Sequence, residues 1–322
     1  MILECANPPD EVEISSQWQS DEVEVSICCI VYNQEQFVEQ TINSFLNQKT
    51  NFRFEILVHD DCSSDSTQQI LGRIQSKYPN IVRLVLQKEN QFSNCRIITP
   101  RFLFPLAKGE FIAMCEGDDF WVDPLKLQTQ YELLNDNPGV GICVHPAHVV
   151  SYDNESVDIE VKQFSPVEGV NGILPFSCFA FSHLQFAPTS SYFFRKHLVD
   201  GLFCKIKNYY AGDLFIEIAC GGNGFITTSK KMSCYRLNTP GSYSAVNKNK
   251  VIDSGMYKLE VSKQLNEYCT YITDYNTIEI VKRKADKYLW SYFKSCIKHR
   301  RFSFRLMKQL LSNTNKFRNF VR

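Results

Sequence analysis

The chain has 322 residues, of which 44% are hydrophobic and 22% charged, and its formal net charge at pH 7 is zero. A chain of this size and composition can bury a full-sized core without help from disulfides or metals. No stretch approaches the roughly 18 consecutive apolar residues of a transmembrane helix, so a membrane-spanning protein is excluded.

The cysteines and the charge pattern further limit the kinds of protein that this chain can be. The chain contains 13 cysteines at irregular spacing and no CxxC pair, which argues against a disulfide framework and against a zinc knuckle. The first residues lack the basic start and long apolar segment of a secretory signal, so we expect a cytoplasmic protein. All charged residues before Val25 are acidic, whereas those from Lys282 onward are basic except for Asp286.

The apolar pattern predicts strands that alternate with helices. Residues 25–31 form a continuous apolar run, as in strands that are buried on both faces of a parallel sheet. Helical spacing follows from Phe37 and again around 70–74. Further strands are expected at 54–59, 81–86 and 110–115. This β-α-β-α-β order predicts a parallel sheet with right-handed crossovers.

The second half of the chain carries a clear helix start and a weaker strand pattern. Asp123 can cap a helix whose first position is Pro124, and apolar spacing continues to about residue 134. Residues 140–150 are predicted as one strand. Further expected elements are a strand at 190–196, a helix at 211–220, a strand-turn-strand at 225–237 and helices beyond Gly241. We therefore predict three regions, at 1–24, 25–241 and 242–322.

Two acidic pairs, Asp60-Asp61 and Asp118-Asp119, directly follow predicted strands. Because the carboxyl ends of parallel strands line one crevice, both pairs are expected to open onto a single site. Carboxylates gathered in this way repel one another, and oxygen ligands without His or Cys favour a hard cation such as Mg²⁺ or Mn²⁺. The alternative is turn and cap chemistry, in which each pair only stabilises its own loop.

The sequence lacks the motifs of several classes of nucleotide-binding protein. No GxGxxG follows the first predicted strand and no GxxxxGK[ST] is present, which disfavours a dinucleotide oxidoreductase and a P-loop NTPase. No nucleic-acid-binding motif accompanies the basic C-terminal region, so no nucleic-acid partner is expected.

Four motifs in order resemble those of bacterial family 2 glycosyltransferases, in particular a subgroup with CEGDD followed by an aromatic pair and DPxKLQ. The motifs are VSICCIVYNQEQFVEQTINSFLNQ, EILVHDDCSSDST, AKGEFIAMCEGDDFWVDPLKLQ and YRLNTPGSYS, which together span about 25–244. The resemblance implies an α/β fold of the GT-A type, a Rossmann-like and mainly parallel sheet with flanking helices. Residues 25–241 would be the glycosyltransferase domain, between an acidic N-terminal extension (1–24) and a basic helical C-terminal region (242–322).

The resemblance also implies how the nucleotide is held. Tyr32 would lie against the base and Asp61 would accept a hydrogen bond from the base edge. Glu116 could contact the ribose, and Arg236 falls in a segment near the diphosphate. Position 238 is Asn where relatives usually have His, which leaves a third metal ligand in doubt.

The remaining implied roles concern the metal and the base. Asp118 and Asp119 would hold the Mn²⁺ or Mg²⁺ ion that bridges the sugar diphosphate, so that Asp118 also counts as nucleotide-binding. Asp213 matches a GD motif that opens a short helix and presents the catalytic base. From the residues alone, a helix N-cap is the favoured explanation of Asp213, and only the resemblance reverses that preference.

The function implied is that of a metal-dependent, inverting glycosyltransferase. It would move a hexosyl or related group from a nucleotide-diphosphate sugar, with a UDP-sugar favoured, to a hydroxyl of a glycan or lipid-linked glycan. Bacterial surface glycan synthesis, such as that of O-antigen or capsule, would be the setting. The alternative is a catalytically silent nucleotide-sugar or glycan-binding module, which Asn238 alone favours.

The basic C-terminal residues suggest a further partner. Residues 282–322 alternate positive charge with aromatic and aliphatic side chains, a pattern that suits helices lying on an anionic membrane surface. We expect a peripheral contact of this kind at the inner face of the membrane. The alternative is an ordinary solvated helical face.

Overall fold

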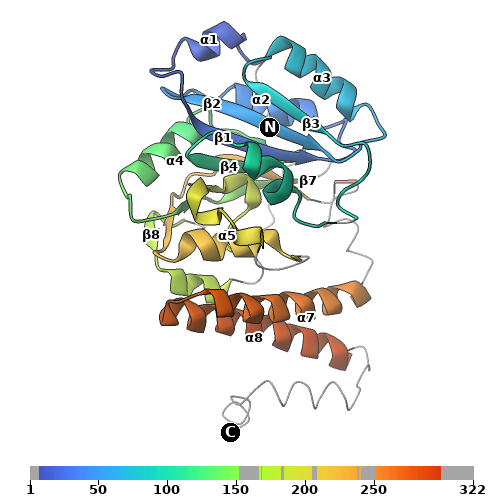
Figure 1. Ribbon diagram of the computed structural model, residues 1–322, viewed down its shortest axis with the longest axis vertical. Helices are drawn as coiled ribbons and strands as arrows, with labels where there is room; N and C mark the ends of the chain where they lie inside the picture. The colour runs from blue at the N-terminus through green and yellow to red at the C-terminus, as the bar shows by residue number, and fades with distance from the viewer. Residues whose placement is uncertain are drawn as a thin grey trace.

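The structure, a computed structural model shown in Figure 1, describes most of the chain. The described residues are 7–93, 95–151, 167, 169–182, 185–204, 209–237, 239–240 and 251–298. The strands are β1 Val23–Val31, β2 Arg53–Asp60, β3 Val82–Leu86, β4 Phe111–Glu116, β5 Phe120–Trp121, β6 Ile142–Val144, β7 Ala147–Ser151, β8 Gly172–Leu174, β9 Phe193–Arg195, β10 Phe225–Thr227 and β11 Ser233–Leu237. The α-helices are α1 Glu11–Ser15, α2 Val38–Leu46, α3 Thr67–Lys77, α4 Lys126–Asn135, α5 Gly212–Gly221, α7 Val251–Tyr268 and α8 Tyr275–Lys298.

Within the described residues the strands form one sheet of eight and one of three. The large sheet has the order β3-β2-β1-β4-β9-β6-β10-β8, and the small one has the order β5-β11-β7. Strand β1 pairs in parallel with β2 and β4, and β2 pairs in parallel with β3. Strand β9 runs antiparallel to β4 and β6, so the sheet as a whole is mixed. The parallel half confirms the α/β arrangement predicted from the apolar runs.

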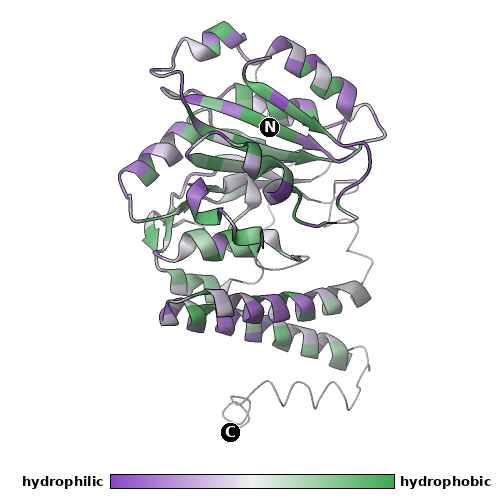
Figure 2. Ribbon diagram, viewed as in Figure 1, coloured by the Kyte–Doolittle hydropathy of each residue, from purple (hydrophilic) through white to green (hydrophobic). Residues whose placement is uncertain are grey.

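The two faces of the large sheet are covered by different helices. Helices α2, α3 and α4 bury apolar side chains on one face, whereas α5, α7 and α8 pack over the other. Figure 1 shows α7 and α8 side by side beneath the sheet. In Figure 2 the strands are mostly hydrophobic, whereas hydrophilic and hydrophobic residues alternate along both of these helices. None of the helices in the described part of the chain combines the length and hydropathy needed to span a bilayer.

Two expectations from the sequence were wrong in detail. Residues 140–150 are not one strand but two, because β6 pairs with β9 and β10 while β7 pairs with β11 of the small sheet. Pro146 lies between them, and proline has no N–H to continue a ladder. The helix after Trp121 begins at Lys126 rather than at Pro124, because Asp123 accepts a hydrogen bond from the Leu125 N–H and closes a separate turn first.

The register of the parallel strands places the acidic segments at one edge. Val31 lies opposite Asp60, and Ile30 lies opposite both His59 and Glu116. The loops that follow β1, β2 and β4 therefore leave the same edge of the sheet, as expected for a site at the carboxyl ends of parallel strands.

Candidate active site

The loops that follow β1 and β2 are joined by a set of hydrogen bonds. The Asn33 N–H donates to the Ser63 hydroxyl at 2.9 Å, and the Ser64 N–H donates to the Asn33 side-chain oxygen at 2.8 Å. The Gln34 N–H donates to the Thr67 hydroxyl at 2.9 Å. Asn33 has a φ of 50°, a left-handed conformation that Asn tolerates better than most residues. These contacts hold the two loops together as one wall of the site.

Tyr32 stands at the surface of this wall. The residue is 45% exposed. The proposed stacking of Tyr32 on a nucleotide base stays a prediction.

The two aspartates after β2 have different partners. The Asp60 carboxylate accepts hydrogen bonds from the Ser63 N–H and hydroxyl and from the Gln68 amide, which is the turn role that the alternative predicts. The Asp61 carboxylate instead accepts the backbone N–H groups of Gln91 and Phe92, at 2.7 and 3.0 Å. Asp61 therefore links the loop after β2 to the loop after β3.

The Glu116-Gly117-Asp118-Asp119 turn packs directly against the loop after β1. The Gly117 N–H donates to the Ile30 carbonyl at 2.9 Å. A Cβ at position 117 would collide with the side chains of Gln34 and Val31, so only glycine allows this close approach. The Thr41 hydroxyl of α2 donates to the carbonyls of Gly117 and Asp119 at 2.8 and 2.7 Å, which fixes the turn from its other side.

The two aspartates of this turn also differ. Asp118 Oδ2 accepts a hydrogen bond from the Thr239 hydroxyl at 2.5 Å. Asp119 is 1% exposed, and its Oδ1 accepts the Arg236 N–H of β11 at 2.9 Å. Asp119 Oδ2 has no hydrogen-bond partner among the described residues. The predicted metal-ligand roles of Asp118 and Asp119 stay predictions.

Arg236 is buried beneath the turn. Its guanidinium lies between the rings of Phe37 and Phe120, at 4.8 and 4.5 Å from their centroids. It donates to the Asp118 carbonyl and to the Gln40 side chain. These contacts give Arg236 a role in holding the turn, whereas its contact with a diphosphate stays a prediction. Asn238 lies outside the described residues.

Asp213 lies near the start of α5 and does not act as a helix cap. The N-cap position is Ala211, and no side-chain hydrogen bond caps this helix. Asp213 is partly buried, and desolvation raises the pKa of its carboxyl to about 6. Burial, with the nearby charges of Asp118 and Asp213, raises the pKa of Glu116 to about 8. Glu116 thus lies within electrostatic reach of Asp118 in its own turn and of Asp213 on α5.

Acidic groups therefore crowd this end of the sheet, where burial disfavours their charged forms. Burial also raises the pKa of Asp118, although the Thr239 hydrogen bond and the Arg236 charge oppose that rise. In the part of the chain that the structure describes, no three His, Cys, Asp or Glu side chains are arranged to hold a metal ion by themselves. A cation here would need further oxygen ligands from a bound molecule, as is usual for Mg²⁺ beside phosphates.

Sequence reasoning missed three residues that shape the site. Thr239 binds Asp118, but nothing in the sequence distinguishes it from other threonines. Glu217 lies one turn after Asp213 on α5 and is completely buried. A signal was present, because Glu217 is a charged residue within the apolar run LFIEIAC. Its partner Tyr192 carries no comparable signal.

Comparison with known proteins gives a family match for the N-terminal part of the chain. Residues 26–166 match the family model described as Glycosyl transferase family 2. An uncharacterized protein of Mycobacterium tuberculosis is 36% identical over 141 residues, 44% of this chain and 40% of its own. The putative teichuronic acid biosynthesis glycosyltransferase TuaG of Bacillus subtilis is 31% identical over 110 residues, 34% of this chain and 41% of its own. The chain thus spans about 40% of the length of these curated relatives.

Solved structures extend the likeness to most of the fold. Residues 1–349 of Staphylococcus aureus TarS, solved in complex with UDP-GlcNAc, superpose with a TM-score of 0.62 at 16% identity, over 82% of this chain and 72% of that one. The mannosyltransferase PcManGT of Pyrobaculum calidifontis, solved with GDP-Man and Mn²⁺, gives a TM-score of 0.55 at 13% identity, over 96% of this chain and 82% of that one. These neighbours are transferases of the GT-A type, which confirms the predicted fold class.

Proposed function

We propose that this chain, of which residues 26–166 match the model of glycosyl transferase family 2, moves a sugar from a nucleotide-diphosphate sugar to an acceptor hydroxyl with inversion at the anomeric carbon. The observation that carries the proposal is that Glu116, at the carboxyl end of β4, lies within electrostatic reach of both Asp118 and Asp213. This arrangement supplies acidic groups for the donor side and a separate carboxylate for the acceptor side. Residues 25–241 would form the transferase domain.

On the donor side, Tyr32 and Asp61 would contact the base, and Glu116 the ribose. We favour a UDP-sugar, because the TarS structure that this fold resembles is a UDP-GlcNAc complex. Arg236 would act on the diphosphate mainly through the turn that it holds, since its guanidinium is occupied by the Asp118 carbonyl and Gln40.

A divalent cation fits this turn. Asp118 and Asp119 would hold Mn²⁺ or Mg²⁺ together with diphosphate oxygens, and the orphaned Oδ2 of Asp119 is a buried acceptor that such an ion would satisfy. When bound, the ion would supply positive charge to the departing diphosphate.

On the acceptor side, Asp213 would remove the proton from the acceptor hydroxyl. The acceptor oxygen forms a bond to the anomeric carbon while the bond from that carbon to the nucleotide diphosphate breaks, and the proton stays on Asp213. A positioned general base typically contributes about 10²- to 10⁴-fold to such a step. The raised pKa of Asp213, about 6, makes it a stronger base than an exposed aspartate while leaving it mostly ionised at neutral pH.

The test of this function is a thermal-shift screen of nucleotide sugars with and without Mn²⁺, followed by transfer assays with the stabilising donor. We propose a glycan or lipid-linked glycan as the acceptor, in line with the name of TuaG, a putative teichuronic acid biosynthesis glycosyltransferase. Slow nucleotide release without acceptor supports the enzyme, whereas tight donor binding without release or transfer would favour the silent binding module.

Asp61→Ala should weaken donor binding before it affects chemistry. The change removes an acceptor for a base edge and also frees the backbone of Gln91 and Phe92. Because hydrogen bonds to charged groups contribute about 1.5–3 kcal/mol, we expect roughly a 10- to 100-fold higher donor Kd by titration calorimetry. Asp136→Ala, at an exposed aspartate after α4, is the matched control. Unchanged donor affinity in Asp61→Ala would remove Asp61 from the nucleotide site.

We also propose that the C-terminal region makes a peripheral contact with an anionic membrane surface. Within the described part of this region, Lys282, Arg283 and Lys294 are exposed on α8, and Lys294 lies 5.7 Å from the ring centroid of Trp290, itself 45% exposed. Residues 299–322 lie outside the described residues. Lysine and arginine near an anionic leaflet contribute about 1 kcal/mol each, so this face suits reversible binding from the cytoplasmic side.

The liposome prediction follows from that face. The full-length protein should co-sediment with anionic vesicles at low salt and be released at high salt, because screening weakens surface attraction. The triple variant Lys282→Glu, Arg283→Glu, Lys294→Glu should sediment several-fold less. Lys49→Glu, Lys108→Glu, Lys230→Glu, at exposed lysines elsewhere, controls for net charge. Equal loss in both triple variants would leave only a general charge effect and remove the membrane role of α8.

A further inference from the structure

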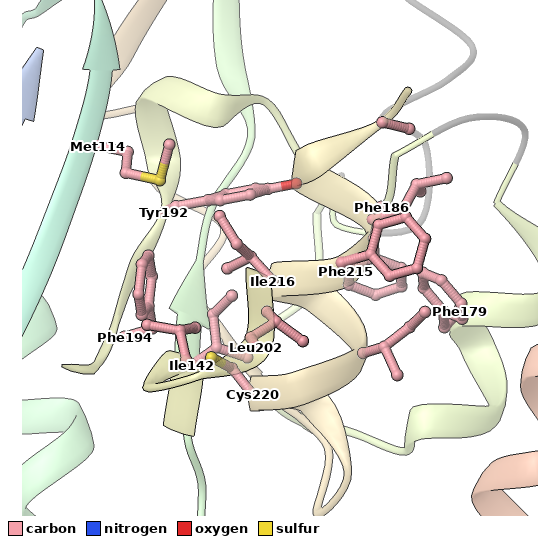
Figure 3. Close-up of a cluster of buried hydrophobic side chains, with 14 of the residues drawn as sticks. Met114, Ile142, Phe179, Phe186, Tyr192, Phe194, Leu202, Phe215, Ile216 and Cys220 are labelled. Carbon is pink, nitrogen blue, oxygen red and sulfur yellow. The ribbon is translucent and has the colours of Figure 1, made fainter. Parts of the chain in front are cut away.

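The buried pair Tyr192 and Glu217 connects the two elements that carry the proposed chemistry. Tyr192 precedes β9, and its carbonyl accepts the Met114 N–H of β4 at 3.0 Å, two residues before Glu116. The Tyr192 hydroxyl donates to Glu217 Oε1 at 2.5 Å, and Glu217 lies one helical turn after Asp213. Figure 3 shows the Tyr192 side chain beside Met114, with its hydroxyl directed toward the helix that carries Phe215 and Ile216.

Glu217 also gathers the segment that leads to Tyr192. Its Oε1 accepts the backbone N–H groups of Phe186 and Ala187, at 2.6 and 3.3 Å. Tyr192 and Glu217 are both completely buried, so water cannot replace these hydrogen bonds. A buried carboxylate that receives several donors from one segment holds that segment in a single position relative to its own helix.

The C-terminal helices α7 and α8 also contribute side chains near Tyr192 and Glu217. Lys284 of α8 is completely buried and donates to the carbonyls of Phe179 and Ser182, at 3.2 and 2.8 Å. Burial raises the pKa of Glu217 to about 8, while its hydrogen bond from Tyr192 and the positive charge of Lys284 oppose that rise. Lys284 therefore lies within electrostatic reach of Glu217. On α7, the Gln264 side chain accepts the Tyr210 N–H at 3.0 Å, just before α5 begins.

We infer that Tyr192 and Glu217 are positioning residues that set the distance of Asp213 from the end of β4, an inference that rests on the proposed function. We name this pair the Tyr192–Glu217 strut. In the proposed reaction the donor lies at the end of β4 and the base on α5, so the strut joins the two elements between which the acceptor would bind. Proton removal and attack require atoms about 3 Å apart, and a misplacement of 1 Å can cost 10²-fold in rate.

The strut has a residue-level test in Tyr192→Phe, which removes one hydroxyl and keeps the ring. We expect kcat to fall about tenfold or more while the donor KM stays within twofold, because the donor contacts are untouched. Tyr78→Phe is the matched control, since it removes a tyrosine hydrogen bond to the Pro9 carbonyl on the opposite face of the sheet. A kcat in Tyr192→Phe equal to that of Tyr78→Phe would overturn the positioning role.

Glu217→Gln and amide hydrogen exchange give a readout that does not depend on activity. The strut predicts faster exchange at Phe186, Ala187 and α5 in both Tyr192→Phe and Glu217→Gln, with β2 unchanged. Unchanged exchange in both variants would overturn the strut. A wild-type protein that transfers no sugar from any nucleotide donor would contradict the proposed function instead, and exchange would still decide whether the strut orders this segment.

Discussion

Asp213→Asn should bind the donor as tightly as the wild type and lose transfer by about 10²-fold or more. Asparagine has the same shape as aspartate but cannot accept the acceptor proton, and removing a general base costs about this much. The helix itself should survive, because Asp213 makes no capping hydrogen bond and the N-cap is Ala211. Titration calorimetry of the donor and single-turnover transfer rates measure the two effects separately.

The pH profile offers a second measurement of the same assignment. The pKa of Asp213 is raised by burial to about 6, and only the ionised carboxylate can take a proton. The wild-type transfer rate should therefore fall as the pH drops below about 6 and level off above it. Asp200→Asn, at an exposed aspartate, should keep both the rate and the profile. Transfer by Asp213→Asn at more than about a third of the wild-type rate would contradict the base assignment.

The fold was predictable where local pattern and long-range pairing agree. The apolar run at 25–31 can only be accommodated by a strand buried on both faces, and the structure shows β1 between β2 and β4. The run at 140–150 looks equally continuous, but its two halves pair with different sheets. Strand partners are chosen by packing between distant segments, and a single sequence does not display that choice.

The edge of the sheet at which the acidic residues gather was predictable, but the separate contacts of each residue were not. Strand order alone brought Asp61 and Asp118 to one edge. The two members of each aspartate pair nevertheless meet different surroundings, because the chain turns directly after β2 and after β4. Asp60 closes its own turn, and Asp119 bonds to the backbone of β11. Those roles depend on partners up to 117 residues away in the chain.

The roles of the surrounding residues were harder still to predict, because they depend on tertiary contacts. Arg236 looked like a phosphate ligand on the strength of its motif, and its observed contacts are with the Asp118 carbonyl, Gln40 and two aromatic rings. The role of Glu217 was easier to infer from the sequence than that of Arg236. A carboxylate in an apolar helix has to find buried donors, and the structure provides them from Tyr192 and the backbone of 186–187.

Donor binding should depend on a divalent cation, which is the second large effect that we expect. The diphosphate of the donor would enter an edge that carries Glu116, Asp118 and Asp119, where burial already raises the carboxyl pKa values, so further negative charge is costly where water is excluded. Arg236 does not offset this charge freely, since its guanidinium is committed to the turn. Calorimetric titration of the donor should show at least about tenfold weaker binding in EDTA than in Mn²⁺, equivalent to about 1.4 kcal/mol.

Two isosteric variants separate the ligand role of each aspartate from its structural role. Asn at position 118 keeps an acceptor for the Thr239 hydroxyl, and Asn at position 119 keeps one for the Arg236 N–H, so the turn should stay intact in both variants. Asp118→Asn should abolish the difference between Mn²⁺ and EDTA, because a neutral amide oxygen is a poorer ligand for a hard cation. Asp119→Asn should do the same if Oδ2 completes the ion's coordination, and should keep the difference if Asp119 only anchors β11. Asp136→Asn, which is exposed after α4, provides the matched control. Equal donor affinity of the wild type in EDTA and Mn²⁺ would overturn the metal role, because the turn would then accommodate the diphosphate without an ion.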